Sequence, residues 1–262
     1  MKRLNLFVKG NVDVHDALIY SRVNGRIQWN GLNTLLGETH PDHVARAHHE
    51  PSARWDHAGI EGQAIPEELA RRQLNLGTLT LTAQFQSAML QRPWDVVVLS
   101  IQGDVMNPLS RHRRDGYNFM AAGSSNWMRE DQRWLKEEFS SSLVTPEASM
   151  QHLTALIKAL RVHSHASVLV FNMSSAIPGE QIVSYRGLED SLATRIRAFN
   201  LALIETSAKL DFSIVDVDQI VARAGADRLK LDAIHYRRDG YRLMAEEVAR
   251  LMEARGVFDD AH

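Results

Sequence analysis

Short, mainly apolar runs alternate with longer segments of helical periodicity along the chain. The runs lie at Leu4–Val8, Val96–Ile101, Ser167–Phe171 and Phe212–Val217, and a shorter one lies at Val44–His48. Such runs are typical of parallel strands that are covered on both faces. Because helical segments separate them, the pattern predicts right-handed crossovers and a three-layer, flavodoxin-like α/β sandwich around a mostly parallel sheet.

The helical segments show start signals as well as periodicity. Pro66–Leu69 and Thr145–Glu147 place proline and glutamate in a first helical turn. Apolar periodicity predicts helices over these ranges: Leu81–Leu90, Glu130–Phe139, Thr145–Val162, Leu188–Leu210 and Tyr241–Arg255. Gln102–Ser125, in contrast, has turn-forming and basic residues with little periodicity, which predicts a long loop. No repeat or linker interrupts this order, so we expect one domain spanning residues 1–262.

Composition narrows the classes of function. The chain has 262 residues, 44% hydrophobic and 24% charged, which is enough to bury the core of one large α/β domain. A formal net charge of −2 gives no global basic field, so we expect neither nucleic acid nor a membrane as partner. The absence of cysteine excludes disulfides, thiolate nucleophiles and cysteine–zinc sites.

The N-terminal segment bears on the compartment. No apolar run of signal-peptide or membrane-span length follows Met1–Arg3, so we expect a cytoplasmic protein. Its expected partner is a small-molecule substrate, and the sequence pattern does not indicate an oligomeric state.

Polar residues gather where the predicted strands end. In an open parallel sheet, ligands bind beyond the carboxyl ends of the strands. Four polar segments lie there: Gly10–Asp16, Gln102–Arg114, Asn172–Glu180 and Asp227–His235. A substrate pocket is therefore expected at this edge of the sheet. The candidate substrate-binding residues are Asp104, Asn107, Arg111 and Ser174.

One of these segments carries a family resemblance. Leu231–His235, followed by Asp239–Tyr241 and Met244–Glu246, resembles the C-terminal block of the SGNH (GDSL-type) hydrolases, in which an Asp-x-x-His pair precedes the last helix. The chain length and the strand–helix alternation are similar to that family over almost the whole sequence. The resemblance implies an SGNH hydrolase-like domain in which Asp232 holds one imidazole nitrogen of His235. The other nitrogen then takes a proton from a nucleophile and returns it to the leaving group.

The first and third sequence blocks of that family are altered here. The family has Gly-Asp-Ser directly after the first strand, whereas this chain has Gly10–Asp13, with Val12 at the position of the nucleophilic serine. The third block, Gly-x-Asn-Asp, corresponds to Ile101–Asp104, with Gly103 in place of asparagine. The glycine of the second block corresponds to Gly59 or Gly62. The resemblance thus implies the scaffold and the Asp232–His235 pair, and leaves the nucleophile open.

Other polar groups near the strand ends are candidates for the missing roles. The side-chain amides of Asn11 and Gln102 are candidate oxyanion donors. Asp13, His15 and Asp16 form an acidic–imidazole cluster that would bind a divalent metal or activate water. The alternative for Asp13 is that it caps a helix beginning near His15.

Hydroxyl and cationic groups complete the set of candidates. Ser100, Ser174 and Ser175 lie near strand ends and are candidate relocated nucleophiles. The basic run Arg111–Arg114 would bind a carboxylate or phosphate. Its alternative role is ion pairing with the acidic pair Glu130–Asp131.

Three functions remain open. The first is an atypical SGNH-like hydrolase or acyl transferase acting on an ester or amide of a small polar molecule, with Asp232 and His235 as acid–base pair. The second is a non-catalytic SGNH-like ligand-binding protein. The third is a metal-dependent enzyme using Asp13, His15 and His235. Loss of the serine favours the last two, and retention of the complete Asp-x-x-His block favours the first, for which we expect no cofactor.

Overall fold

A five-stranded parallel sheet forms the centre of the computed structural model, which describes residues 1–52, 54–55, 64–178 and 191–259. Its strands are β1 (Lys2–Lys9), β4 (His43–Glu50), β5 (Val96–Ser100), β9 (Ser167–Phe171) and β10 (Ser213–Val215). They lie in the spatial order β10-β9-β5-β1-β4, and every neighbouring pair is parallel. The predicted parallel strands are confirmed, with small shifts at their ends.

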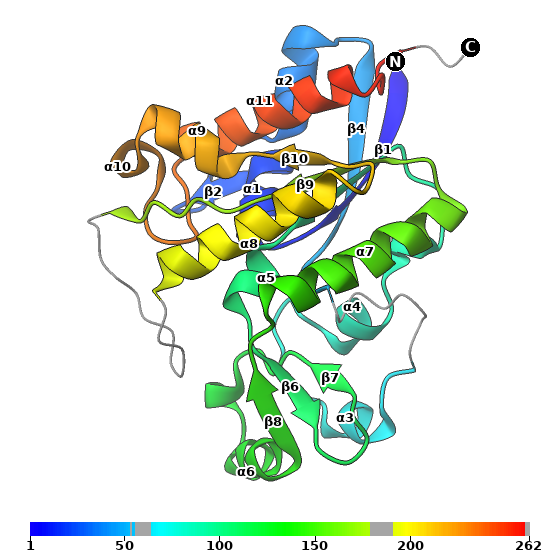
Figure 1. Cartoon of the computed structure of the whole chain (residues 1–262), viewed down its shortest axis with the longest axis vertical. Coiled ribbons are helices and arrows are strands. Elements are labelled where there is room, and N and C mark those ends of the chain that lie inside the picture. Colours follow the sequence, from blue (N-terminus) through cyan, green and yellow to red (C-terminus); the bar gives the residue numbers. More distant parts are fainter. Residues whose placement is uncertain (53, 56–63, 179–190, 260–262) are drawn as a thin grey trace.

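Helices cover both faces of this sheet, as Figure 1 shows for α9 and α11 on one side and α7 and α8 on the other. One face carries α1 (Val12–Leu18), α2 (Leu32–Thr39), α9 (Val217–Ala224) and α11 (Arg238–Ala254), and the other carries α7 (Pro146–His163) and α8 (Leu192–Ser207). Successive side chains of a strand point to opposite faces. Leu6 and Val8 accordingly pack in one core and Phe7 in the other. The three-layer sandwich is confirmed.

The predicted helices are present, with one exception. The hydroxyl of Thr145 accepts from the Ala148 amide and starts α7, while α6 covers Arg129–Glu138. Leu81–Leu90 does not form one helix, because α4 (Leu81–Phe85) stops and a short 3₁₀ turn, η2 (Ala88–Leu90), follows. The hydroxyl of Ser87 accepts from the Met89 amide and starts this new turn. The predicted helix start at Leu188 lies outside the described residues.

The prediction of a long loop over Gln102–Ser125 is wrong. This segment contains α5 (Gln102–Met106), β6 (Leu109–His112), β7 (Asn118–Phe119) and the 3₁₀ turn η3 (Ser124–Asn126). In the antiparallel sheet β7-β6-β8, strand β6 also pairs with β8 (Phe139–Ser142). These strands are too short to show a period of two in the sequence, and β8 is distant along the chain.

The antiparallel sheet, α6 and α3 (Glu67–Arg72) form a smaller lobe below the sandwich in Figure 1. Its buried side chains form a separate apolar cluster that includes Leu69, Phe119, Trp134 and Phe139. The sandwich and this lobe therefore have their own cores.

The remaining elements are small. The strands β2 (Ser21–Val23) and β3 (Arg26–Trp29) form a hairpin whose turn residues, Asn24 and Gly25, have φ values of 50° and 75°. Positive φ at both central positions is the mark of a type I′ turn. A short helix, α10 (Ala226–Leu229), precedes the Asp-x-x-His block. Within the described ranges, no helix combines the length and the apolar character needed to cross a membrane.

Candidate active site

Asp232 and His235 lie in the turn between α10 and α11 and bind each other directly. His235 donates from Nδ1 to Oδ2 of Asp232 at 2.7 Å. The other carboxylate oxygen, Oδ1, accepts from the backbone N–H groups of Ile234 at 2.9 Å and His235 at 2.8 Å. The carboxylate is therefore fixed by its own turn, and it fixes the imidazole. Nε2 of His235 is left for proton transfer, on a side chain that is 46% exposed.

The charge state of Asp232 follows from these contacts. Partial burial acts to raise the pKa of Asp232, but the hydrogen bonds from Ile234 and His235 outweigh it and leave the pKa below its ordinary value. The carboxylate is thus ionised at neutral pH, as the partner of a proton-accepting imidazole must be.

Lys230 anchors this turn and was not predicted from the sequence. Its side chain is 1% exposed, and Nζ donates to the carbonyl oxygens of Ser174 at 3.2 Å and Ala176 at 2.7 Å. Burial lowers the pKa of Lys230 to about 8, against the opposing effect of Asp218 and Asp232. A single lysine just before the Asp-x-x-His block gives no sequence signal of this role. The contact joins the segment after β9 to the turn that carries His235.

A second group of polar residues joins the end of β1 to the end of β5. Asp13 is buried, and it accepts hydrogen bonds from the hydroxyl of Ser100 and, at 3.2 Å, from the backbone N–H of Asn11. The backbone N–H of Gln102 in turn donates to Oγ of Ser100 at 3.0 Å. Gly10 lets the end of β1 lie close to α1, because a Cβ at this position would lie 2.4 Å from a methyl group of Val14. Asn11, Asp13 and Gln102 are therefore brought together.

Asp13 does not cap a helix beginning near His15. The helix α1 begins at Val12, and its N-cap residue is Asn11, whose side chain makes no capping hydrogen bond. Asp13 lies within the first turn, where burial raises its pKa in spite of the hydrogen bonds that it accepts. Its observed contacts are those of an internal link between α1 and β5.

The three candidate serine nucleophiles all have partners in the structure. Ser100 donates to Asp13, and Oγ of the buried Ser174 accepts from the Ala176 amide at 3.3 Å. The hydroxyl of Ser175 donates to Asp218 at 3.4 Å. At the position of the family's serine, Val12 is half-buried and has no nucleophilic atom.

The Asp232–His235 pair and the polar group around Asp13 approach each other at Tyr236 and Tyr241, the tyrosines that follow His235. Burial raises the pKa of Tyr236, the charge of Asp13 raises it further, and a hydrogen bond with the backbone of Ser174 opposes this. The hydroxyl of Tyr241 accepts from the Tyr236 amide at 3.3 Å. Its pKa is raised by burial, with contributions from the charges of Asp13 and Asp232. Tyr236 and Tyr241 therefore lie within electrostatic range of Asp13. A cleft shared by His235, Asn11 and Gln102 stays a prediction.

His15 and Asp16 pair with each other on α1. Nδ1 of His15 contacts Oδ1 of Asp16 at 2.7 Å, and the ring of His15 lies 4.9 Å from that of His49. Burial lowers the pKa of His49. Across the described part of the chain, no three histidine, aspartate or glutamate side chains gather as a metal site would require. The metal site at Asp13, His15 and His235 stays a prediction.

The candidate substrate-binding residues are dispersed. Asp104 is buried and accepts from the Trp55 amide at 3.0 Å and the Ser149 hydroxyl at 2.8 Å, so it connects three segments of the core. Asn107 is half-buried at the end of α5. Arg111 is exposed on β6 of the small lobe, and Ser174 is covered.

The basic run in the small lobe does not pair as expected. Asp131 pairs with Arg72 at 2.8 Å, while Arg114 pairs with Asp115 at 3.1 Å. His112 is buried and contacts Asp115 as well. The glycines proposed for the family's second block, Gly59 and Gly62, lie outside the described residues.

Comparison with known proteins identifies the fold. No family model matches the sequence, and no curated protein matches it. Among solved structures, the chain is similar to LAE5, an alpha/beta hydrolase enzyme from the metagenome of Lake Arreo, with 15% identity, a TM-score of 0.50, and coverage of 98% of this chain and 97% of that one. It is also similar to Axe2, an acetylxylan esterase from Geobacillus stearothermophilus, with 12% identity, a TM-score of 0.50, and coverage of 94% and 93%.

A third similar structure is a protein assigned as a GDSL-like lipase from Parabacteroides merdae, with 14% identity, a TM-score of 0.50, and coverage of 97% and 96%. These similarities extend over nearly the whole chain, and they agree with the all-parallel central sheet and its two helical layers. This chain has an SGNH hydrolase-like fold.

Proposed function

We propose that this protein is an atypical SGNH-like hydrolase or acyl transferase that acts on an ester or amide of a small polar molecule. Asp232 and His235 are its acid–base pair. The observation that carries the proposal is the 2.7 Å contact between His235 Nδ1 and an Asp232 carboxylate that two backbone amides hold in place. A carboxylate fixed in this way orients the imidazole before the substrate binds, which is the arrangement that general-base catalysis requires.

The proposed reaction proceeds without an acyl-enzyme. Val12 has no nucleophilic atom, and the hydroxyls of Ser100, Ser174 and Ser175 are engaged in internal hydrogen bonds. His235 Nε2 therefore takes a proton from water or from a hydroxyl group of the acceptor substrate. The resulting oxygen nucleophile attacks the acyl carbon and forms the new C–O bond. The bond to the leaving group then breaks, and the imidazolium returns its proton to that group.

Charge on the acyl oxygen needs hydrogen-bond donors during this step. We assign this role to the side-chain amides of Asn11 and Gln102. Asn11 is the N-cap residue of α1 and Gln102 is the first residue of α5, at neighbouring strand ends. The shared hydrogen bonds through Asp13 and Ser100 support this assignment, because they fix the two helix starts relative to each other. Loss of one such donor typically costs about 10²–10³ in kcat.

The proposed substrate class rests on the similar structures and on the presence of Val12 where the family has its nucleophilic serine. One of those structures is an acetylxylan esterase, which supports an acyl ester as the bond that is cleaved or transferred. A small polar acceptor is favoured because the proposed general base deprotonates a hydroxyl group or water. The cytoplasm remains the proposed location.

A panel of short acyl esters, combined with a fluorophosphonate probe, tests the proposal. We expect turnover of at least one ester, no labelling by the probe, and no acyl adduct in intact-protein mass spectrometry. An adduct on Ser100, Ser174 or Ser175 would show that a serine has taken over the nucleophilic role, and would contradict the direct mechanism.

The second candidate function is ligand binding without catalysis. Val12 at the nucleophile position and the internal partners of the three serines favour it. In that case the panel gives no turnover, although an ester binds saturably and the His235→Ala variant binds it equally well. Turnover that is lost in a chelator and restored by a divalent cation would instead support the metal site at Asp13, His15 and His235.

A further inference from the structure

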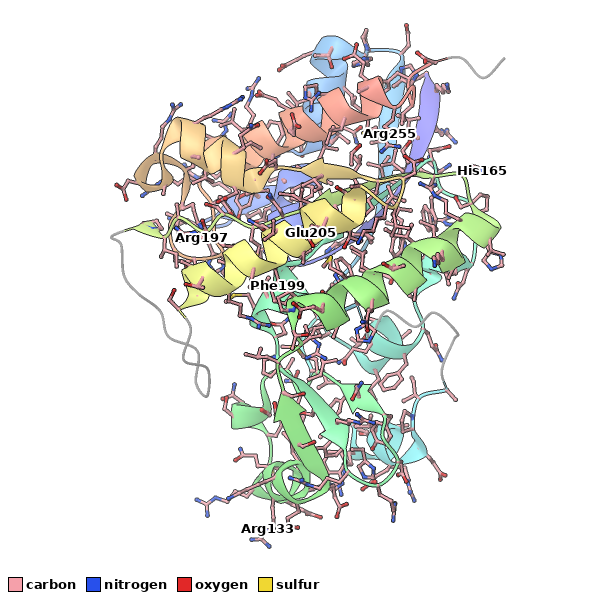
Figure 2. The ribbon with its side chains drawn as sticks, viewed as in Figure 1. Arg133, His165, Arg197, Phe199, Glu205 and Arg255 are labelled. Carbon is pink, nitrogen blue, oxygen red and sulfur yellow. The ribbon has the colours of Figure 1, made fainter. Side chains whose placement is uncertain are left out.

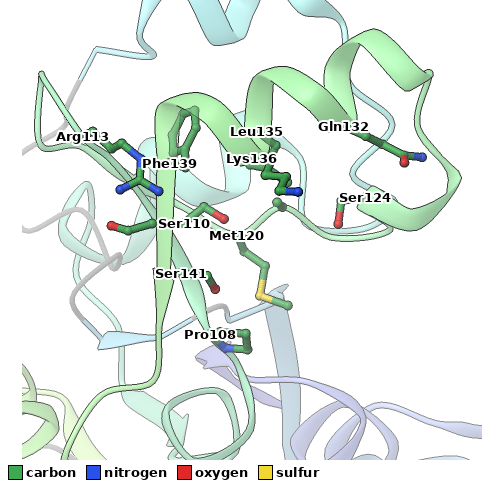
Figure 3. A pocket seen from close by; sticks show the side chains of 12 residues that line it. Pro108, Ser110, Arg113, Met120, Ser124, Gln132, Leu135, Lys136, Phe139 and Ser141 are labelled. Atoms are coloured by element: carbon green, nitrogen blue, oxygen red, sulfur yellow. The ribbon is translucent and has the colours of Figure 1, made fainter. Parts of the chain in front are cut away.

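The small lobe contains a pocket that is separate from the Asp232–His235 pair. Its volume is about 570 Å³, within the range of small-molecule sites. The helix α6 forms one wall, and the strands β6 and β8 form another. Figure 3 shows Arg113 at one end of this pocket and Lys136 further along it.

The polar side chains that line the pocket are either positively charged or neutral, and they can donate hydrogen bonds. Arg113 and Lys136 contribute the charges, and Ser110 and Ser141, which are paired across β6 and β8, contribute hydroxyls. None of the described residues that line the pocket is acidic. The site therefore has a net positive charge.

Arg113 is held in position by α6. Its backbone N–H donates to the Glu138 carbonyl at 2.8 Å, and its Nε donates to the Glu137 carbonyl at 3.1 Å. These carbonyls belong to the last turn of the helix, where a cation is favourable. The terminal guanidinium nitrogens are thereby left as a donor pair on a side chain whose direction is already fixed.

The two cations of the pocket differ from their neighbours in pairing. Arg72 pairs with Asp131 at 2.8 Å, and Arg114 pairs with Asp115 at 3.1 Å. Among the described residues, no carboxylate lies within ion-pair distance of Arg113 or Lys136. Two cations that face one pocket without a counter-ion favour an external anion there.

The apolar part of the lining restricts the type of anion. Met120, Leu135 and Phe139 lie beside the charged groups, and Phe139 belongs to the core of the lobe. An inorganic ion would contact only the donors, whereas an organic anion would also cover these apolar side chains.

We propose that this pocket binds a small organic anion, in which a carboxylate or phosphate group contacts Arg113 and Lys136 and an apolar portion packs on Met120, Leu135 and Phe139. The proposal does not depend on the acid–base role of His235. It assigns a ligand site to the small lobe. The proposed hydrolytic function gives this lobe no ligand.

Anilinonaphthalene sulfonate is a suitable probe, since it combines one anionic group with an apolar body and fluoresces when shielded from water. Its uncharged counterpart, phenylnaphthylamine, lacks the sulfonate. We expect the sulfonate to bind the wild-type protein more tightly than the uncharged compound, and its binding to weaken as salt is added. Arg113→Ala and Lys136→Ala should each weaken it by about tenfold.

Arg133→Ala is the matched control, because Arg133 lies on the same helix, is exposed and does not line the pocket. Figure 2 shows it at the outer end of the lobe. Its removal should leave the affinity unchanged, and Arg113→Lys should retain part of the binding. Circular dichroism checks that the variants are folded, which their exposed positions favour.

Competition identifies the anionic group. Displacement of the probe by phenyl phosphate but not by benzoate assigns a phosphate ligand, and the reverse assigns a carboxylate. Displacement by neither overturns the proposal. Equal affinity for the charged and uncharged probes, or equal effects of Arg113→Ala and Arg133→Ala, also overturns it.

Discussion

At the scale of single residues, the proposed catalysis depends on the position of one proton. Asp232 accepts from Nδ1 of His235, so in the neutral imidazole Nε2 is the nitrogen without a proton and acts as the base. In Asp232→Asn, Oδ1 still accepts from the turn amides, but the side-chain amide now faces Nδ1 and favours the opposite tautomer. We expect kcat/KM on the best ester to fall by about 10²–10⁴-fold with the thermal unfolding temperature little changed. Asp239→Asn, an exposed carboxylate on α11, is the control. Equal activity of the Asp232→Asn variant would contradict the assigned tautomer.

Lys230 gives a prediction in the alkaline range. Its pKa falls from 10.5 to about 8 in the folded protein, mainly through burial. Below pH 8 the side chain is charged in both the folded and unfolded states, so its burial costs stability throughout that range. Between about pH 8 and 10.5 only the unfolded state keeps the extra proton, so folding becomes more favourable as pH rises.

The unfolding free energy of the wild type, relative to that of Lys230→Met, should therefore increase over that interval by on the order of 2 kcal/mol. Urea unfolding at a series of pH values measures it. A difference that stays constant, or that decreases with pH, would show that the lysine is not buried as described.

At the scale of secondary structure elements, the link between α1 and β5 is the feature most open to test. Ser100→Ala removes the hydroxyl donor to Asp13 and the acceptor of the Gln102 amide. A buried group left without a partner costs about 1–3 kcal/mol, and we expect a loss of stability of this size. Ser175→Ala, at a half-buried hydroxyl, should cost less than about 0.5 kcal/mol. Chemical denaturation compares the two, and equal losses would argue against the internal link.

The sequence predicts the elements whose signal is local and strong. Val96–Val98 are apolar at successive positions because both faces of β5 are covered, and this shows directly in the sequence. The Asp232–His235 contact was also predictable, since both residues lie in one short turn. The lobe was not, because β6 pairs with the two-residue strand β7 and with β8, which begins at Phe139 and is distant along the chain. The contacts of Lys230 and Asp13 likewise depend on segments far away in the chain.

At the scale of the whole molecule, Arg195 of α8 connects the sandwich to the small lobe. Its guanidinium donates to the carbonyls of Val105 at 2.8 Å, Asp104 at 3.1 Å and Val144 at 2.7 Å. It also lies over the ring of Phe199, at 4.6 Å from the centroid; Phe199 is labelled on α8 in Figure 2. Val105 precedes the lobe's antiparallel sheet and Val144 follows it. One side chain thus holds the chain where it enters and where it leaves this sheet.

Arg195→Met should consequently weaken the attachment of the small lobe more than it weakens the packing of the sandwich. We expect a loss of about 2–4 kcal/mol in unfolding free energy, because three buried carbonyls lose a donor. Limited proteolysis should give earlier cleavage near the two connections. Arg197→Met, on the exposed side of α8, is the control. Cleavage patterns that match between the two variants would contradict the role of Arg195.

In the proposed mechanism His235, rather than a serine, carries out the chemical step. The most direct measurement is kcat/KM of His235→Ala beside Ser100→Ala, Ser174→Ala and Ser175→Ala on one ester. General-base catalysis is typically worth about 10²–10⁴-fold, so the histidine variant should lose activity in that range. The folded fraction of Ser174→Ala and of Ser175→Ala should keep nearly all of its activity. Ser100→Ala should lose less activity than His235→Ala, because it loses only the link that positions the proposed oxyanion donors. Full activity in His235→Ala, or an inactive but folded variant at one serine, would contradict the proposed mechanism.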